Sequence, residues 1–470
     1  MPEALMLAYH TSRAILLTWA IFTVAHHSAP TWPRRIFTAG VLAGYFLCLV
    51  LTYQMPYDFK RFWQVGADLW AGVDYYSLNP TGERQLILNP PTILPLFQLW
   101  AVLPLRDSAK LWTALNAVCV FGLVPLAYLA LLRQGTGTGP GTGTGPSSRL
   151  SRPTLGLLAC VVATSCATGM GLALGQVSLL AVAAILLALW AQGANKPWLA
   201  GIGLAVATVK INTVLPFLTL FLRRKDVPSW ISLGLVGLGL CLLGGPLTEL
   251  PRRCNTTLQT IRGTFEPGRV NDYSDLGDSH ASLIGIDQAL YRIGLRDRRL
   301  ISTLQATVLT ALLVSLARHA NRPHVPRANS CGLAALVASL FFYHRVYDEL
   351  ILVLPMLLGA IQHVATKSPR LKRAWGAVFA LSLLVTFISP DGLRLIHAET
   401  TIPGFGPVLL RAIMLPLGVW LAGAALGICW WASSTVTPRA NLCETSPSGP
   451  TAVSPGKGAA DSGKVNSAAG

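Results

Sequence analysis

The chain has 470 residues, of which 52% are hydrophobic and only 12% are charged. A soluble domain carries about 25% charged residues, so this composition excludes an ordinary water-soluble fold and favours a protein embedded in a bilayer. The formal net charge of +17 would suggest nucleic-acid binding in a soluble protein. In a membrane protein it indicates instead that Lys and Arg gather in cytoplasmic loops. We therefore expect membrane lipids, and no nucleic acid, as partners.

The N-terminal part of the chain precedes the first membrane span. Residues 1–35 contain a short apolar stretch without a clear cleavage site, so we expect a cytoplasmic or interfacial segment rather than a cleaved signal. Residues 36–54 are the first apolar run of the roughly 17–25 residues needed to cross a bilayer. Arg34 and Arg35 place its start in the cytoplasm. Residues 55–88 then form an outer loop.

Residues 57–70 of this loop predict an amphipathic helix on the outer membrane surface. Asp58 begins the helix, where a carboxylate serves either as an N-terminal cap or as a catalytic group, and the residues alone leave both alternatives open. Apolar and polar side chains recur on opposite faces: Phe59, Phe62, Trp63, Gly66, Leu69 and Trp70 against Asp58, Arg61, Gln64 and Asp68.

A Gly-Thr repeat within residues 134–153 predicts a flexible linker. The arginines that flank it favour the cytoplasm, whereas counting every apolar run as a full span places it outside. The conflict disappears if one neighbouring run does not cross: either the Pro-rich residues 89–105 or residues 198–222, which Lys210 divides. We expect ten to thirteen spans in an all-α polytopic bundle.

Two polar positions interrupt the central apolar runs. A Lys at a membrane centre costs about 2.5–3.5 kcal/mol, so Lys210 requires a partner carboxylate, a re-entrant helix end or a lipid phosphate. Gln176 follows Gly175 in an otherwise apolar stretch. Such a Gln either joins helices through hydrogen bonds or contributes to a site.

Basic stretches at residues 223–225, 318–327 and 367–373 belong in the cytoplasm. The outer face then receives residues 249–299, 343–349 and 391–406, while residues 432–470 form a disordered cytoplasmic tail. Fifteen of the twenty Asp and Glu residues fall in the outer segments, including the first loop. Long polar loops or chemistry on that face would each explain this asymmetry.

The outer segment 249–299 contains Asp272, Asp275, Asp278 and His280. Their spacing matches no EF-hand loop. We interpret this stretch as a solvated acidic loop and expect no metal site.

The late turn, residues 343–349, lies between apolar flanks of about 12–15 residues, which extend roughly 18–23 Å against a hydrocarbon core of about 30 Å. The turn is therefore predicted below the outer surface, inside a cavity, where ionisable groups are functional candidates. His344 and Arg345 are suited to hold an anionic phosphate, with Asp348 orienting one of them. The alternative is an ion pair at a helical hairpin.

In order along the chain, five short motifs resemble the GT-C superfamily of membrane glycosyltransferases. Within it they are similar to the branch of polyprenol-phosphate-sugar-dependent mannosyl- and arabinofuranosyltransferases. The sequence departs from the branch at residues 279–283 and in the late position of Pro216. The motifs are Asp58-Phe59-Lys60, Trp70-Ala-Gly-Val-Asp74-Tyr-Tyr, Asn89-Pro90-Pro91, Gly175-Gln176 with Lys210, and His344.

The resemblance implies a helical bundle with an outer active site, in which Asp58 is the general base and His344 meets the donor phosphate. It also implies a glycolipid or glycan acceptor, inversion at the sugar, and no cofactor. The multi-pass protein would lie in a bacterial plasma membrane with both termini in the cytoplasm, and residues 36–431 would form the transferase domain. The further candidates are Arg345, Lys60 and Lys210 for the phosphate, and Arg61, Asn89, Gln176, His280 and Asp348 for substrate.

Two other classes of function fit the same residues. A transporter or flippase of polyprenyl lipids would use the same cations without a base. It would be expected to show repeats and charges near the midplane, and the sequence has no evident repeat. A non-catalytic scaffold predicts that Asp58 and His344 do not converge.

Overall fold

The computed structural model describes residues 55–73, 94–135, 150–269, 271–274, 283–323, 325–341, 344–388 and 416–435, together with residues 15, 18, 19, 40 and 90. The predicted first span at 36–54 lies outside the described residues apart from residue 40. Most of the linker, the loop 391–406 and nearly all of the C-terminal tail also lie outside them.

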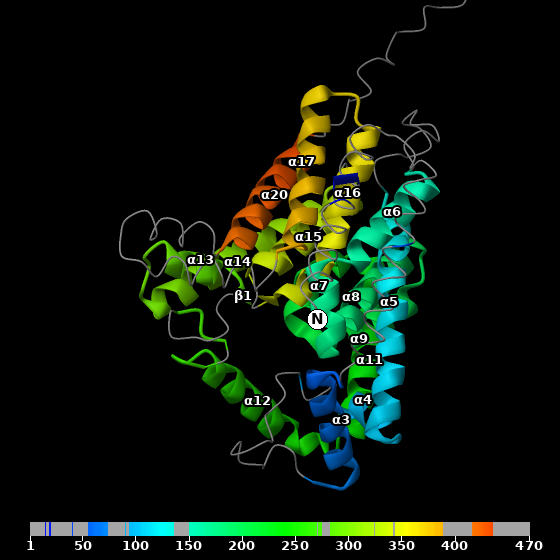
Figure 1. Ribbon diagram of the computed structural model, residues 1–470, viewed down its shortest axis with the longest axis vertical. Coiled ribbons are helices and arrows are strands. Elements are labelled where there is room, and N and C mark those ends of the chain that lie inside the picture. Colours follow the sequence, from blue (N-terminus) through cyan, green and yellow to red (C-terminus); the bar gives the residue numbers. More distant parts are fainter. Residues whose placement is uncertain are drawn as a thin grey trace, which may run out of the picture.

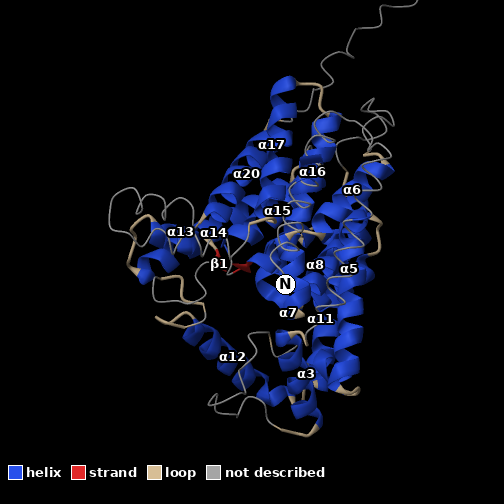
Figure 2. Cartoon of the chain, in the orientation of Figure 1, coloured by secondary structure: helices blue, strands red, loops and turns tan. Residues whose placement is uncertain are grey.

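The described chain is a bundle of α-helices (Figures 1 and 2). Two short strands, β1 Leu283–Ile284 and β2 His344–Arg345, pair antiparallel. The predicted all-α polytopic class is confirmed. The α-helices are α3 Tyr57–Trp70, α4 Pro95–Ala101, α5 Leu105–Arg133, α6 Arg152–Ala163, α7 Cys166–Leu174, α8 Ser178–Gly193, α9 Pro197–Ala207, α10 Ile211–Leu218, α11 Val227–Leu243, α12 Leu250–Thr264, α13 Ile286–Arg292, α14 Arg298–Asn321, α15 Arg327–Phe341, α16 Val353–Ala365, α17 Pro369–Val385 and α20 Leu417–Ser434. The 3-10 segments are η4 Thr208–Lys210, η5 Thr219–Phe221, η6 Arg224–Asp226, η7 Leu247–Glu249 and η9 Val346–Leu352.

Six helical stretches of the described residues are long and apolar enough to cross a membrane. A seventh is obtained if α6 and α7, bent by 54° at their junction, count as one span. The shorter apolar helices α8 and α15 are additional to these. The expected ten to thirteen spans include segments outside the described residues, so that number stays a prediction. The six stretches are Leu105–Arg133, Pro197–Phe221, Arg224–Leu243, Arg298–Asn321, Val346–Ala365 and Leu417–Ser434.

The ends of the helices gather at two opposite ends of the bundle. Helices α3 and α12 lie toward one end of the bundle, while the connection from α16 to α17, which carries the basic residues 367–373, lies at the opposite end (Figure 1). Helix α5 begins near α3 and reaches the opposite end, where α6 starts (Figure 1). The linker is therefore attached at the same end as the basic connection.

One of the two runs proposed as non-crossing is short in the structure. Helix α4 has only seven residues, which is about 10 Å at 1.5 Å per residue. Residues Pro197–Phe221, by contrast, form one continuous stretch of 25 residues with the 3-10 segment η4 at its centre. The geometry therefore favours the Pro-rich segment as the one that does not cross.

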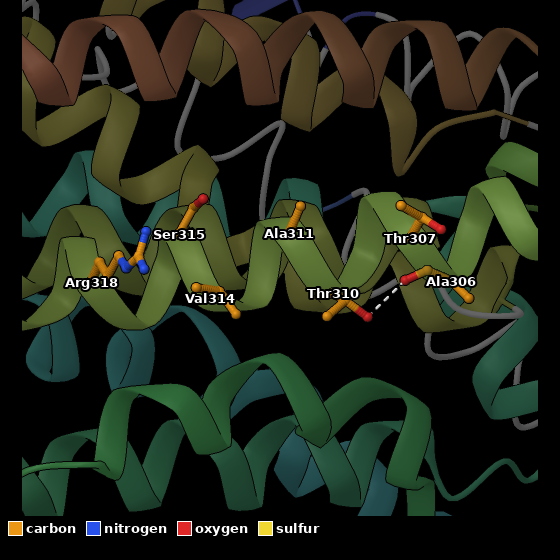
Figure 3. A pocket seen from close by; sticks show the side chains of 7 residues that line it. All are labelled: Ala306, Thr307, Thr310, Ala311, Val314, Ser315 and Arg318. Carbon is orange, nitrogen blue, oxygen red and sulfur yellow. Dashed lines mark hydrogen bonds between the residues drawn. The ribbon is translucent and has the colours of Figure 1, made fainter.

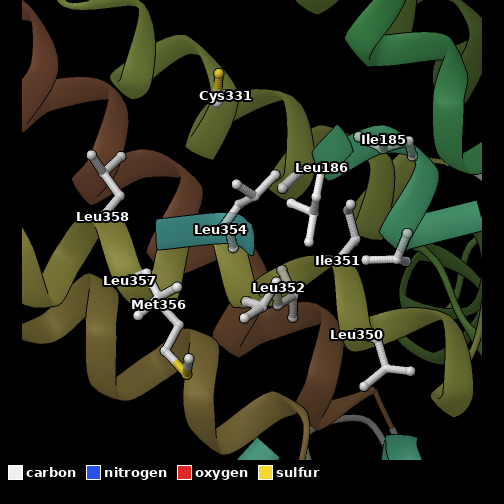
Figure 4. Close-up of a cluster of buried hydrophobic side chains, with 14 of the residues drawn as sticks. Ile185, Leu186, Cys331, Leu350, Ile351, Leu352, Leu354, Met356, Leu357 and Leu358 are labelled. Atoms are coloured by element: carbon white, nitrogen blue, oxygen red, sulfur yellow. The ribbon is translucent and has the colours of Figure 1, made fainter. Parts of the chain in front are cut away.

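The core lies where η9 and α16 pack against α8 and α15 (Figure 4). Leu350, Ile351 and Leu354 are at most 1% exposed, and every residue of α15 after Arg327 is buried. Close packing, rather than the hydrophobic effect, drives such contacts in a bilayer. Gly359 permits the approach of α17, because a Cβ there would stand 2.6 Å from the Phe379 nitrogen.

Helix α3 differs from its prediction in two ways. Its aromatic face packs on the protein: the rings of Phe59 and Trp112 are stacked 5.3 Å apart, and those of Phe62 and Phe97 are 4.6 Å apart. The amphipathic pattern therefore reflects docking on α4 and α5. Asp68, expected on the polar face, is buried and accepts a hydrogen bond from Gln64 at 3.0 Å.

The outer segment 249–299, predicted as a polar loop, is largely helical in its described part. Helix α12 runs apart from the bundle, and α13 lies beside the start of α14 (Figure 1). The strand pair β1–β2 joins this region to the late turn, since Leu283 pairs with Arg345. Two segments about 60 residues apart in sequence thus meet at one place.

Candidate active site

Asp58 lies in the first turn of α3. The helix begins at Tyr57 and its N-cap is Pro56, with no side-chain cap hydrogen bond. The carboxylate instead accepts a hydrogen bond from the Gln176 amide and lies 3.9 Å from the Arg61 guanidinium. The capping role considered for Asp58 is therefore wrong, and its side chain is held by a residue 118 positions later.

The junction between α7 and α8 determines where Gln176 lies. Helix α7 ends at Gly175 in the left-handed region, with φ +68°, a conformation that glycine adopts without steric cost. Trp112 donates to the Gly175 carbonyl at 2.9 Å. A Cβ at Gly175 would stand 2.6 Å from the Pro56 Cβ, so the start of α3 rests directly on this junction.

A second polar cluster lies within the bundle. Lys210, at the 3-10 break between α9 and α10, forms an ion pair with Asp348 of η9. The side chains are 13% and 1% exposed, respectively. Ser178 donates to the same carboxylate oxygen at 2.6 Å, and the Lys210 ammonium lies 4.7 Å from the centre of the Tyr347 ring. Of the partners considered for Lys210, the structure provides the carboxylate.

Arg345 links this cluster to the outer segment. Its backbone nitrogen donates to the second Asp348 oxygen at 3.2 Å, and its guanidinium donates to the Asn271 side chain at 3.4 Å. Asp348 therefore orients Lys210 and the Arg345 backbone. An orienting effect of Asp348 on the side chain of His344 or Arg345 stays a prediction.

The two clusters act on the same carboxylate. Burial raises the pKa of Asp58 above its ordinary value, while Arg61, the Gln176 hydrogen bond, Arg345 and Lys210 lower it in decreasing order. The desolvation effect is the larger one. A carboxylate with a raised pKa is a stronger base than an exposed aspartate, and both Arg345 of the late turn and Lys210 lie within electrostatic range of it.

The structure brings six predicted site residues into this region. Of the remaining four, Lys60 is exposed, and the described residues show no side-chain bond from it to either cluster. Asn89 and His280 lie outside the described residues. His344 is described only by its backbone, which pairs with Ile284. The six residues are Asp58, Arg61, Gln176, Lys210, Arg345 and Asp348.

Four residues that hold these groups in position, Ser178, Trp112, Tyr347 and Asn271, carry no specific signal in the sequence. Ser178 and Tyr347 stand within two residues of predicted candidates, so adjacency is their only indication. Among the described residues, no three His, Cys, Asp or Glu side chains lie together as a metal site.

Two hollows lie on or beside α14. The larger, of about 650 Å³, follows one face of α14 and is lined by small and hydroxyl-bearing residues, with Arg318 at its end (Figure 3). It contains no carboxylate. The smaller, of about 290 Å³, lies near the outer end of α14 and is lined by aromatic, acidic and amide side chains.

A helical bundle whose described residues include six stretches long and apolar enough to cross a membrane defines an integral membrane protein. The profile of Glycosyltransferase family 87 matches residues 88–390, more than half of the chain. The chain therefore belongs to this family and is a membrane glycosyltransferase. No curated protein matches the chain. The matched region contains Gln176, Lys210 and Asp348, whereas Asp58 precedes it.

Proposed function

We propose that the protein transfers a sugar, mannose or arabinofuranose, from a polyprenyl-phosphate donor to a glycolipid or glycan acceptor on the outer face, with Asp58 as general base. The observation that carries this proposal is the contact between Asp58 and Gln176. The carboxylate held there has a raised pKa and lies within electrostatic range of Arg345 in the late turn and of Lys210. The resemblance of the ordered motifs supports the choice of donor and sugars.

In the proposed reaction, Asp58 accepts the proton of the acceptor hydroxyl while that oxygen attacks the anomeric carbon. The new C–O bond forms as the bond from the anomeric carbon to the phosphate oxygen breaks, and the electron pair leaves with the polyprenyl phosphate. This single displacement inverts the anomeric carbon. The leaving group is a phosphate and already acidic, so it requires cationic stabilisation rather than a separate acid.

The charges of the site agree with a base at Asp58 and separate cations for the leaving phosphate. Asp348 balances the charge of Lys210, and Arg345 of the late turn lies close enough to Asp58 to lower the pKa of that carboxylate. We assign Arg345 to the donor phosphate, assisted by His344, Lys60 and Lys210. One base with a cationic group differs from the carboxylate pair with which most glycosidases activate water.

A polyprenyl donor also fits the location. The cation Lys210 is largely enclosed among apolar helices, a position that a lipid phosphate can approach from the bilayer with its tail between helices. A nucleotide sugar would need an aqueous route and a phosphate-binding loop such as a helix N-terminus rich in glycine. The sequence has no such loop.

The largest effect is expected from Asp58→Asn, which removes the proton acceptor and keeps the shape. Purified full-length protein in nanodiscs would be incubated with radiolabelled polyprenyl-phosphate mannose, polyprenyl-phosphate arabinofuranose or nucleotide-linked mannose, together with a membrane glycolipid extract. Transfer from one polyprenyl donor should fall about 10²–10⁴-fold in the variant, the range of general base catalysis.

Asp107→Asn is the matched control, because Asp107 is an exposed carboxylate at the start of α5 that pairs with Lys110 at 3.3 Å. It should retain wild-type transfer. Full activity of Asp58→Asn, or transfer from the nucleotide-linked sugar alone, would overturn the proposal.

A further inference from the structure

The smaller hollow near α14 is built from four separate segments. It has a volume of about 290 Å³, at the lower end of the range of about 300–1,000 Å³ for small-ligand pockets. Its walls come from the end of α12, the loop 271–274, α13 and the first turns of α14. The lining residues are Phe265, Tyr273, Asp287, Arg298, Ser302 and Gln305.

A buried ion pair fixes one wall of this cavity. Asp272 is fully buried and accepts hydrogen bonds from Gly268 at 2.7 Å, Ser274 at 2.9 Å and Arg298 at 2.6 Å. Burial alone would raise the pKa of Asp272, but these hydrogen bonds together lower it. Arg298 also donates to the Phe265 carbonyl at 2.6 Å. The positive charge in the wall is therefore already balanced.

The second carboxylate of the cavity, Asp287, is not balanced. It accepts a hydrogen bond from the Gln288 backbone at 2.9 Å, and among the described residues no basic side chain forms an ion pair with it. Burial raises its pKa. Gly285 supports its position, because a Cβ there would collide with the Asp287 carboxylate. Among the lining residues the cation is Arg298, which already pairs with Asp272, so the cavity offers a phosphate no unpaired cation.

The remaining lining groups suit hydroxyl-bearing ligands. Tyr273 and Phe265 provide aromatic surface, which pairs with the apolar faces of ring compounds. The Gln305 amide nitrogen donates to the Phe341 carbonyl at 2.8 Å, so its oxygen is the group left for a ligand hydroxyl. An aromatic surface with a carboxylate, an amide oxygen and the Ser302 hydroxyl is a set of partners for one uncharged sugar ring.

The cavity borders the proposed reaction centre through one residue. Asn271, which accepts from Arg345 at 3.4 Å, directly precedes Asp272 and Tyr273. The strand pair places Leu283, two residues before Gly285, opposite Arg345. A ligand held in the cavity would therefore lie beside the residue assigned to the donor phosphate.

We propose that this cavity is a subsite that binds an uncharged sugar ring of the acceptor, with Asp287 accepting hydrogen bonds from its hydroxyls. The identification of this sugar as part of the acceptor rests on the proposed function, but the binding of a neutral sugar does not depend on catalysis. The cavity would select the acceptor, while Arg345 and Lys210 serve the donor.

Binding is tested directly by saturation-transfer NMR on the full-length protein in nanodiscs, with methyl α-mannopyranoside, methyl α-arabinofuranoside and inorganic phosphate as separate probes. At least one glycoside should bind the wild type and Asp58→Asn equally, and phosphate should not compete with it. Asp287→Asn should weaken this binding about tenfold, and Phe265→Leu should weaken it severalfold while preserving apolar volume. The acceptor KM should rise in parallel, with the donor KM unchanged.

Glu266→Gln is the matched control, because Glu266 is an exposed carboxylate next to Phe265 that does not line the cavity. It should bind glycosides as the wild type does. Unchanged binding in both Asp287→Asn and Phe265→Leu, equal weakening in Glu266→Gln, or displacement of the glycoside by phosphate would overturn the subsite. Glycoside binding that depends on Asp287, in a protein whose Asp58→Asn variant still transfers sugar, would instead refute only the proposed role of Asp58.

Discussion

Asp58 and Asp348 are both carboxylates held beside a cation, yet their surroundings differ. The Asp348 side chain is 1% exposed and forms an ion pair with Lys210, with further hydrogen bonds from Ser178 and the Arg345 backbone. The Asp58 side chain is 20% exposed and has one amide donor and a guanidinium at 3.9 Å. The Asp348 carboxylate is surrounded by protein donors, whereas the Asp58 carboxylate retains the capacity to accept a substrate proton.

Asp348 therefore has a structural role, and Asp58 has a chemical role. A buried carboxylate that is surrounded by protein donors fixes four segments, α8, η4, β2 and η9, in one arrangement. A partly exposed carboxylate with a raised pKa is suited to exchange a proton. Substitutions in the inner cluster should therefore affect stability and activity together, whereas substitutions around Asp58 should affect activity more than stability.

The largest combined effect is expected from Lys210→Met. The substitution leaves the Asp348 carboxylate buried without its cation, and breaking a buried pair costs about 3–5 kcal/mol. Thermal unfolding in detergent should shift to lower temperature, and transfer should be lost. The double variant Lys210→Met with Asp348→Asn removes the unpaired charge and should recover much of the stability without recovering transfer. Equal stability of the single variant and the wild type would contradict the structural role of the pair.

A smaller effect on stability, with a clear loss of activity, is expected from Gly175→Ala. The backbone at Gly175 has φ +68°, which costs a residue with a Cβ about 1–2 kcal/mol. The new Cβ would also press on Pro56 and Phe59, at 2.6 and 2.9 Å, and would displace Asp58. A displacement of about 1 Å can cost 10²-fold in rate.

Gly171→Ala is the matched control for this variant. Gly171 lies inside α7, and a Cβ at this position would have its nearest neighbouring atom 3.7 Å away, an ordinary contact. Transfer kinetics and unfolding temperature should match the wild type. If both alanine variants behaved alike, the support of α3 by the Gly175 junction would be refuted.

The fold class is predictable because a low charged fraction and repeated apolar runs have few interpretations. The docking of α3 is not predictable, since an aromatic face at helical spacing fits a membrane surface and a protein neighbour equally well. Only the structure shows Phe59 stacked on Trp112. The helices of the segment 249–299 also escape prediction, because their polar residues resemble those of a solvated loop.

For the candidate site, the sequence indicates the individual groups but not their pairing. Lys210 is predicted to need a partner because an isolated cation in an apolar run is costly, yet nothing local points to Asp348, 138 positions later. Gln176 presents the same difficulty, since its contact with Asp58 spans 118 positions. Long-range pairs of this kind depend on how the helices pack, which a single sequence does not specify.

The pH dependence of transfer tests the region around Asp58. Transfer requires the ionised carboxylate, so the rate should rise with pH through the pKa of Asp58. The Gln176 hydrogen bond lowers that pKa. Gln176→Leu should therefore raise it further, moving the acidic limb of the pH–rate profile to higher pH with a severalfold loss of rate below the limb. Gln64→Leu, on the exposed face of α3, should leave the profile unchanged.

The smallest effect is expected from Arg61→Gln. Arg61 also lowers the pKa of Asp58, but the pair is 3.9 Å apart with side chains 31% and 20% exposed. Because salt screens exposed charges, the acidic limb should move to higher pH at low ionic strength and return toward the wild-type position in about 1 M salt. The shift caused by Gln176→Leu should persist in salt, since it arises from a hydrogen bond to a buried amide. Arg61 also donates a hydrogen bond to Tyr57. A shift in Arg61→Gln that did not respond to salt would show that Arg61 positions Asp58 by contact, through Tyr57, rather than through its charge.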